Sequence, residues 1–196
     1  MKKAMFMLAL ASMMLTATGC FSQTETSSKV KWMSVPQALE QASKDGDSAK
    51  MFFIDCYTDW CGYCRLLDSK TFSNDTVAAI LNYYYYPCKF DAEGRQPVKI
   101  NGNIYNPSTR QGRGGTHELM KLLWEGQSGS GYPTMAIRKS DFRAADCLLG
   151  FRNAQELEPV LVYFAEGYNK EMSLKKFSDK YSKKYRGEVL KKVFEK

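Results

Sequence analysis

The chain has 196 residues, of which 44% are hydrophobic and 13% aromatic; this is enough for the core of one decorated domain and excludes general disorder. The formal net charge is +7, but residues 169–196 alone hold ten Lys/Arg and four Asp/Glu. Because the excess charge is confined to this tail, the composition argues against a uniformly basic surface for nucleic acid.

The first 19 residues are predicted to be a signal peptide. Two lysines precede the apolar run Ala4–Leu15, which is too short to span a bilayer comfortably. Small residues then lead to Cys20 in the sequence ATGC, which resembles a bacterial lipidation motif, although that motif's usual leucine is absent. We therefore expect a lipid on Cys20 that anchors the protein to a membrane, followed by a flexible tether over 20–29. The alternative is ordinary cleavage after Gly19 and a soluble secreted protein.

Strands and helices alternate along the rest of the chain. The expected strands are Val30–Met33, Lys50–Tyr57, Tyr83–Asp91, Pro133–Ser140 and Asp146–Phe151, and the expected helices are Ser34–Gly46, one beginning near Trp60, Asn74–Asn82, Thr116–Gly126 and Asn153–Gly167. The nearly continuous apolar run of Lys50–Tyr57 is typical of a buried central strand. This order predicts an α/β fold in which helices flank a central sheet.

The sequence divides into one domain with two additions. The domain is expected over 30–167, with an irregular insertion at about 93–131 and a basic helical extension over 168–196. In the extension, Leu174, Phe177 and Tyr181 share one helical face. We expect this stripe to dock on the domain with the lysines outward; contact with an anionic membrane is the alternative.

The sequence DWCGYC places Cys61 and Cys64 two residues apart, and three uses of the pair are open. A zinc site needs about four ligands, and His117 is the single histidine of the chain. A permanent disulfide across so short a loop would constrain the unfolded chain little. The third use is redox exchange: a cysteine at a helix N-terminus is stabilised as a thiolate, and a second cysteine one turn later can resolve the mixed disulfide.

Two segments resemble the thioredoxin superfamily. FFIDCYTDWCGYC resembles its buried strand and WCxxC motif, and GYPT at Gly131–Thr134 resembles the loop that holds its cis-proline. The resemblance implies a thioredoxin-like fold with a central mixed sheet, in which Asp55 handles the proton of the resolving cysteine and Lys89 is the basic partner of Asp55. The residues it assigns are Cys61, Cys64 and Asp55 as catalytic, Trp60, Gly62, Tyr63 and Lys89 as supporting, and Tyr132, Pro133 and Thr134 as substrate-binding.

The long insertion is similar to that of exported thioredoxin-like proteins of the thioredoxin-7 type from Bacteroidetes-type bacteria. The resemblance implies a periplasmic thiol–disulfide oxidoreductase, most simply a reductase, that acts on exported proteins with disulfides or thiols. It needs no cofactor and no metal, and a membrane redox partner recycles the cysteine pair. The Gly-Tyr between the cysteines is similar to that of periplasmic disulfide isomerases and leaves the direction open. The alternative is a thioredoxin-fold binding or scaffold lipoprotein whose CxxC is not catalytic.

Three further cysteines and the histidine have less specific patterns. Cys56 and Cys88 should point away from Asp55; we expect inert buried thiols, with a second disulfide as the alternative. Cys147 is expected to be a small residue of the closing hairpin. His117 is expected to be an exposed residue at the start of its helix.

Overall fold

A computed structural model describes residues 29–110 and 113–195. The predicted signal peptide, Cys20 and nearly all of the predicted tether lie outside these residues. Within them the elements are α1 (Val35–Asp45), a 3-10 turn (Gly46–Ser48), β1 (Met51–Tyr57), α2 (Gly62–Leu67), a π-helical segment (Asp68–Phe72), α3 (Asp75–Tyr84), β2 (Tyr85–Asp91), β3 (Val98–Ile100), β4 (Asn103–Tyr105), α4 (Leu119–Leu123), β5 (Thr134–Arg138), β6 (Ala144–Leu149), α5 (Ala154–Ala165), a 3-10 turn (Tyr168–Lys170), α6 (Leu174–Lys180), a second π-helical segment (Tyr181–Tyr185) and α7 (Arg186–Phe194).

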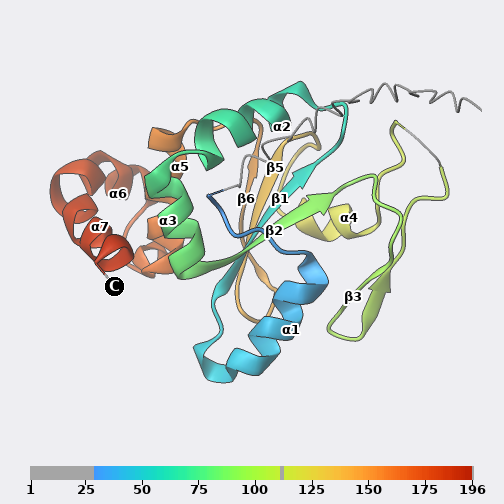
Figure 1. Cartoon of the computed structure of the whole chain (residues 1–196), viewed down its shortest axis with the longest axis horizontal. Coiled ribbons are helices and arrows are strands. Elements are labelled where there is room, and N and C mark those ends of the chain that lie inside the picture. The colour runs from blue at the N-terminus through green and yellow to red at the C-terminus, as the bar shows by residue number, and fades with distance from the viewer. Residues whose placement is uncertain (1–28, 111–112, 196) are drawn as a thin grey trace, which may run out of the picture.

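The central sheet has the strand order β2-β1-β5-β6 among the described residues. β1 runs parallel to β2 and antiparallel to β5, and β5 pairs antiparallel with β6. All residues of β1 except its first and last are buried, as the apolar run predicted. The mixed sheet flanked by helices confirms the predicted α/β, thioredoxin-like fold class (Figure 1).

Alternate residues of β1 enter two separate cores. Phe53 belongs to a core shared with α2, α3, α5 and the C-terminal helices, which we call the α5 core. Phe52, Ile54 and Cys56 belong to a core shared with α1, β3 and α4, which we call the α1 core. Successive side chains of a strand point to opposite faces, so the two cores lie on the two faces of the sheet (Figure 1).

The predicted helix starts are largely correct. Ser34 caps α1 in a capping box with Gln37, and Asn153 caps α5 in the same way with Glu156. Asn74 caps α3 by accepting hydrogen bonds from the backbone N–H groups of residues 76 and 77.

Two predicted strands are partly wrong. Val30–Met33 forms no strand, because only Met33 makes a bridge to Cys88 at the edge of the sheet. Tyr83 and Tyr84 belong to the last turn of α3, and β2 starts at Tyr85. In each case the side chains are typical of a strand, but the backbone groups form hydrogen bonds of a helix or loop instead of a strand ladder.

The insertion contains a hairpin that the sequence analysis missed. β3 and β4 pair antiparallel around Asn101 and Gly102, both of which have positive φ. Asn-Gly is the preferred pair for a two-residue hairpin turn, so the signal was present in the sequence KINGNIY. The predicted helix Thr116–Gly126 is shorter, as α4.

The C-terminal extension docks on the domain, as predicted. Phe177 and Tyr181 are buried in the α5 core, and Leu174 is partly buried against it. Glu158 of α5, itself 6% exposed, accepts hydrogen bonds from the hydroxyl of Tyr181 (2.9 Å) and the Nε of Arg186 (2.7 Å). Among the described helices, none is both long and apolar enough to cross a membrane.

Candidate functional site: a disulfide at the start of α2

Cys61 and Cys64 form a disulfide where β1 passes into α2, with Cα atoms 5.3 Å apart. Cys61 is the N-cap residue of α2, and its Sγ accepts a hydrogen bond from the backbone N–H of Cys64 (3.0 Å). Once the bond is reduced, the positive end of the helix and this N–H favour a thiolate at Cys61. The predicted placement of Cys61 at a helix N-terminus is therefore confirmed.

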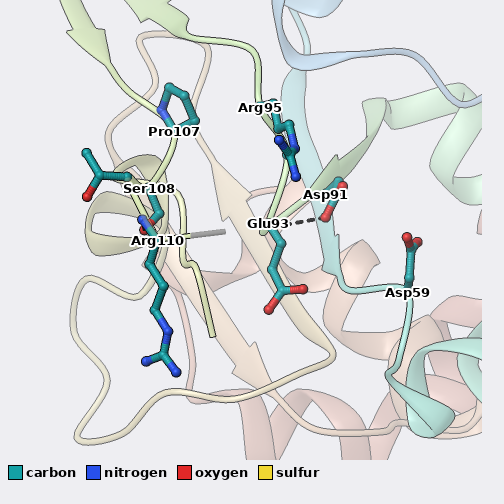
Figure 2. A pocket seen from close by; sticks show the side chains of 9 residues that line it. Asp59, Asp91, Glu93, Arg95, Pro107, Ser108 and Arg110 are labelled. Carbon is teal, nitrogen blue, oxygen red and sulfur yellow. Dashed lines mark hydrogen bonds between the residues drawn. The ribbon is translucent and has the colours of Figure 1, made fainter. Parts of the chain in front are cut away.

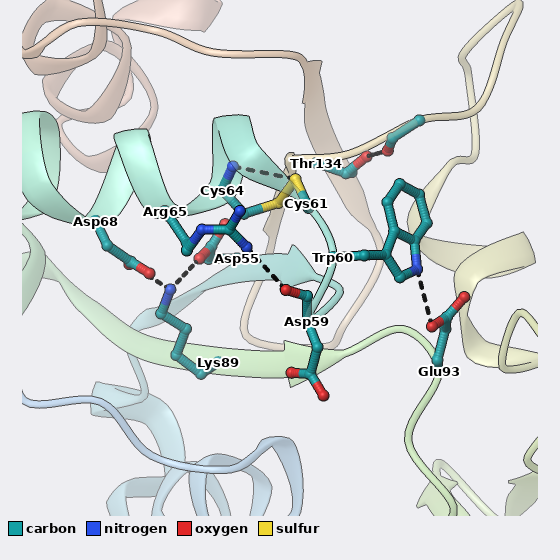
Figure 3. Close-up of a disulfide and its surroundings, with 11 residues drawn as sticks. Asp55, Asp59, Trp60, Cys61, Cys64, Arg65, Asp68, Lys89, Glu93 and Thr134 are labelled. Carbon is teal, nitrogen blue, oxygen red and sulfur yellow. Dashed lines mark hydrogen bonds and ion pairs between the residues drawn. A yellow bond between two sulfur atoms is a disulfide. The ribbon is translucent and has the colours of Figure 1, made fainter. Parts of the chain in front are cut away.

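Asp55 lies on β1 among the residues around the disulfide (Figure 3). Its side chain is fully buried, and its Oδ2 accepts a hydrogen bond from the Nζ of Lys89 on β2 (2.6 Å). Its Oδ1 has no hydrogen-bond partner among the residues that the structure describes. Burial raises the pKa of Asp55 to about 6, although the positive charge of Lys89 acts in the opposite direction. A carboxyl group with this pKa can hold or release a proton near neutral pH.

Lys89 also contacts a second carboxylate. Its Nζ lies 2.5 Å from the Oδ1 of Asp68, the first residue of the π-helical segment after α2. Burial alone would lower the pKa of Lys89, but Asp55 and Asp68 together hold that pKa above its usual value. The ammonium group is further enclosed by aromatic rings, those of Trp32, Tyr57 and Phe72, at 5.1 to 5.4 Å from their centroids.

The loop before β5 has the predicted cis-proline. The Tyr132–Pro133 peptide bond is cis, and the ring of Tyr132 lies edge-on to that of Trp60, with 6.0 Å between centroids. The structure thus brings Tyr132 beside the residue that precedes Cys61. Thr134 is buried, accepts a hydrogen bond from the Nε1 of Trp124 (3.0 Å) and donates one to the carbonyl of residue 131 (2.6 Å).

Gly62 and Tyr63 begin α2 between the two cysteines, and Tyr63 is 65% exposed. Gly150, after β6, donates its N–H to the carbonyl of Pro133 (2.8 Å) and has a φ of 80°, which favours glycine there. The predicted site residues are thus gathered at one end of the sheet.

The insertion holds Trp60 in place, which the sequence analysis did not foresee. The Nε1 of Trp60 donates a hydrogen bond to Glu93 (3.0 Å), which also accepts one from the backbone N–H of Gly114 (2.6 Å). The guanidinium of Arg113 lies 4.6 Å from the centroid of the Trp60 ring. Neither contact has a local sequence signal, because the partners are separated by more than thirty residues. Asp68, in contrast, has a local sequence signal, because it follows Cys64 by four residues and therefore lies about one helical turn after it.

A polar pocket of about 720 Å³ lies between the end of β2 and the insertion. Figure 2 shows the side chains that line it. The pocket is lined by Asp59, Asp91, Glu93, Gly94, Arg95, Pro107, Ser108, Thr109 and Arg110. Because Asp59 directly precedes Trp60, the pocket opens beside the disulfide loop. Among the described residues, no group of three or more His, Cys, Asp or Glu side chains is placed to hold a metal ion.

Cys56, Cys88 and Cys147 are buried free thiols. The prediction that Cys56 and Cys88 are buried thiols is confirmed, and a disulfide between them is not present. Burial is the largest cause that raises the pKa of all three: well above the usual value for Cys56, upward for Cys88, and to about 11 for Cys147. Few thiolates form at neutral pH, so these cysteines are poor nucleophiles.

The prediction of an exposed His117 is wrong, because the side chain is 1% exposed. Its Nδ1 accepts a hydrogen bond from the backbone N–H of Leu119 (3.1 Å), and its Nε2 lies 3.0 Å from the carbonyl oxygen of Gln96. Both ring nitrogens are therefore satisfied by backbone groups, and the ring packs edge-on against Phe90. His117 therefore connects the start of α4 to the segment between β2 and β3 that contains Gln96.

Comparison with known proteins identifies a family for the chain. A family model described as "Thioredox_DsbH: Protein of unknown function, DUF255" matches residues 12–120, which is more than half of the chain. The chain belongs to this family. The matched range contains Asp55, Cys61, Cys64 and Lys89 and ends before the cis-proline loop. No curated protein matches the chain.

Solved structures that are similar to the chain include three with bacterial sources. A solution structure described as a "putative disulphide-isomerase" from Bacteroides thetaiotaomicron is 26% identical over 73% of this chain and 94% of its own, with a TM-score of 0.46. A thioredoxin from Thermus thermophilus is 17% identical over 74% and 98%, with a TM-score of 0.48. The reduced DsbD C-terminal domain from Neisseria meningitidis is 20% identical over 70% and 93%, with a TM-score of 0.41. The fold assignment itself rests on the sheet order, the disulfide position and the cis-proline described above.

Proposed function

We propose that the protein is a thiol–disulfide oxidoreductase that reduces disulfides of exported proteins through Cys61 and Cys64. The observation that carries this proposal is the Cys61–Cys64 disulfide at the N-terminus of α2, with a buried carboxyl group, Asp55, among its surroundings. A purely structural disulfide would have no use for a buried carboxyl group whose pKa is raised by its burial, since such a group costs stability.

The reaction follows from these groups. In the reduced protein, the Cys61 thiolate attacks a substrate disulfide, and the first substrate sulfur leaves as a thiolate. Cys64 then gives its proton to Asp55 and attacks the Sγ of Cys61, and the second substrate sulfur leaves. Two protein thiols become one disulfide while one substrate disulfide becomes two thiols, so atoms and electrons balance without a further cofactor.

The other predicted residues have supporting roles in this proposal. Lys89 stabilises the carboxylate of Asp55, Trp60 and Tyr63 form the exposed surface beside the cysteines, and Gly62 begins α2 between them. Tyr132, Pro133 and Thr134 present backbone next to the disulfide, where an extended substrate segment can pair with it. The polar pocket beside Trp60 gives such a segment a second surface.

Export, lipidation of Cys20 and kinship with thioredoxin-like proteins of Bacteroidetes-type bacteria are part of the proposal and rest on the sequence. A domain over 30–167 with a 168–196 extension would then lie on the periplasmic side, tethered by 20–29. A thiol donor in the membrane would reduce the disulfide again after each cycle. Metabolic labelling with a fatty acid tests the anchor: Cys20→Ala should abolish incorporation, and labelling that persists would contradict it.

Insulin reduction by the purified protein with a thiol donor tests the activity. We expect turnover in the wild-type protein, none in Cys61→Ser, and an accumulated mixed disulfide in Cys64→Ser. Cys147→Ala, which changes a buried thiol outside the site, is the matched control and should retain turnover. No turnover in the wild-type protein, together with no exchange in a redox titration, would favour the scaffold alternative. A reductase should have a reduction potential near that of thioredoxins, about −270 mV, and a value above about −150 mV would instead indicate an oxidant.

A further inference from the structure

Lys89 makes two ion pairs with one ammonium group. Its Nζ contacts Asp55 on β1 at 2.6 Å and Asp68 of the π-helical segment at 2.5 Å (Figure 3). The rings of Trp32, Tyr57 and Phe72 surround the same nitrogen. With aromatic rings around it, the ammonium group has little freedom to move from one carboxylate to the other.

The two carboxylates differ in their access to water. Asp55 is fully buried, whereas the side chain of Asp68 is 48% exposed and that of Lys89 is 24% exposed. For Asp55, Lys89 is the one hydrogen-bond partner found among the residues that the structure describes. When Lys89 interacts with Asp68, its stabilisation of the Asp55 carboxylate is weakened, and no other described group compensates for this loss.

We propose that Asp68 is a positioning residue for the exchange reaction, because it shares the Lys89 ammonium with Asp55 and so limits how strongly the buried carboxylate is stabilised. The proposal deepens the proposed function, on which its catalytic meaning rests. Asp68 does not touch the reacting sulfurs in this account. It acts through Lys89 on Asp55, and Asp55 acts on Cys64.

The other titratable groups near Asp55 and Lys89 do not account for the effect that we assign to Asp68. Among the described residues, the charged side chains that shift the pKa of Asp55 are those of Lys89 and Asp68. From α2, Arg65 directs its guanidinium to the backbone carbonyl of residue 59 (2.9 Å), and Cys61 and Cys64 are joined as a disulfide. On β1, burial raises the pKa of both Tyr57 and Cys56, so both side chains are neutral at physiological pH.

Neutralising Asp68 and neutralising Lys89 should shift the titration of Asp55 in opposite directions. Asp68→Asn removes a negative charge and leaves the whole ammonium to Asp55, so the Asp55 carboxylate is stabilised and titrates at lower pH. Lys89→Met removes the stabilising charge, so Asp55 titrates at higher pH. Asp68→Glu keeps the charge one methylene further out and should stay close to the wild type.

The test is a ¹³C-carboxyl NMR titration of Asp55 in the oxidised protein, in which Cys61 and Cys64 do not titrate. We expect its midpoint to fall by roughly half a unit to one unit in Asp68→Asn and to rise by about one unit or more in Lys89→Met. Asp179→Asn, which removes an exposed aspartate paired with Lys175, is the matched control and should leave the midpoint unchanged.

The pH profile of insulin reduction completes the test. The acidic limb of the profile should move with the NMR midpoint in each variant, and Asp68→Glu should restore it. An Asp55 midpoint that does not fall in Asp68→Asn would overturn the proposal, whatever the activity. A midpoint that falls in a protein without any reductase activity would instead support the charge sharing and contradict the proposed function.

Discussion

The two faces of the central sheet carry opposite chemistry, although they are built from alternate residues of the same strands. On the face of the α5 core, β1 and β2 contribute Asp55 and Lys89, which lie near the Cys61–Cys64 disulfide. On the face of the α1 core, their neighbours Cys56 and Cys88 are thiols buried among apolar side chains. A shift of one residue along the strand therefore separates a charged pair that can move protons from cysteines that burial keeps inert.

Each face is also extended by a different addition to the chain. The C-terminal extension enlarges the α5 core through Phe177, Tyr181 and Val189, and it packs against α3 and α5. The insertion enlarges the α1 core through β3 and α4, and it reaches around to bond Trp60 and Thr134 beside the disulfide. The extension thus serves stability, whereas the insertion connects a core to the loops of the site.

The largest effect on stability is expected from removing a side chain of the C-terminal extension that is buried in the α5 core. Phe177→Ala removes a fully buried ring that contacts the rings of Tyr163 and Tyr168, and should lower the free energy of unfolding by about 3–5 kcal/mol. Phe194→Ala, at an exposed position of the same extension, should change it by less than about 0.5 kcal/mol. Urea denaturation measures both. Equal losses in the two variants would mean that the extension does not share the α5 core.

The next largest effect should be a gain of stability at Asp55. Its pKa is raised to about 6 in the folded protein from 3.8, so well below pH 3.8 it is protonated in both the folded and the unfolded state. As the pH rises from 4 to 6, the unfolded chain ionises first, and the wild-type protein loses stability relative to Asp55→Asn. Above pH 6 the variant should be more stable by about 3 kcal/mol.

Denaturation curves between pH 3 and pH 8 check this prediction. The difference between wild type and Asp55→Asn should grow across the interval from pH 4 to pH 6 and then stay level. A difference that is constant from pH 3 to pH 8 would show that the carboxyl group is not destabilised by its burial.

The smallest effect should come from the insertion's bond to the cis-proline loop. Trp124→Phe removes the Nε1 donor to Thr134 but leaves Thr134 its hydrogen bond to the carbonyl of residue 131. One lost hydrogen bond costs about 1 kcal/mol, which lowers Tm by about 2–4 °C in a chain of this size. An unchanged Tm in a calorimetric scan would show that the insertion is not fastened to the site through this bond.

Local patterns were enough to predict the elements that surround the site. The nearly continuous apolar run before Tyr57 predicts β1, and apolar positions at helical spacing after Asn153 predict α5. The cis-proline loop is predicted by the resemblance of the sequence GYPT to the thioredoxin superfamily. Each of these signals lies within a short stretch of the chain. The same holds for the position of Cys61 at a helix N-terminus.

Contacts between distant segments could not be predicted in this way. The burial of His117 depends on the carbonyl of Gln96, twenty-one residues earlier, and the meeting of Lys89 with Asp68 depends on how the π-helical segment passes over β2. The fixing of Trp60 by Glu93 and Arg113 needs the whole insertion to be folded. The hairpin at Asn101 and Gly102 is different in kind, because its turn signal was local and was overlooked.

The three buried thiols also couple the order of folding to the order of oxidation. In the unfolded chain Cys56 lies only five residues before Cys61, so under oxidising conditions the two can pair as readily as Cys61 and Cys64. Formation of the sheet fixes Cys56, Cys88 and Cys147 on β1, β2 and β6, whereas Cys61 and Cys64 lie together at the start of α2. Among the cysteines that the structure describes, a chain that pairs its strands before it meets an oxidant forms the Cys61–Cys64 disulfide, whereas a chain oxidised earlier must first reshuffle. The sheet therefore selects the correct pairing simply by forming.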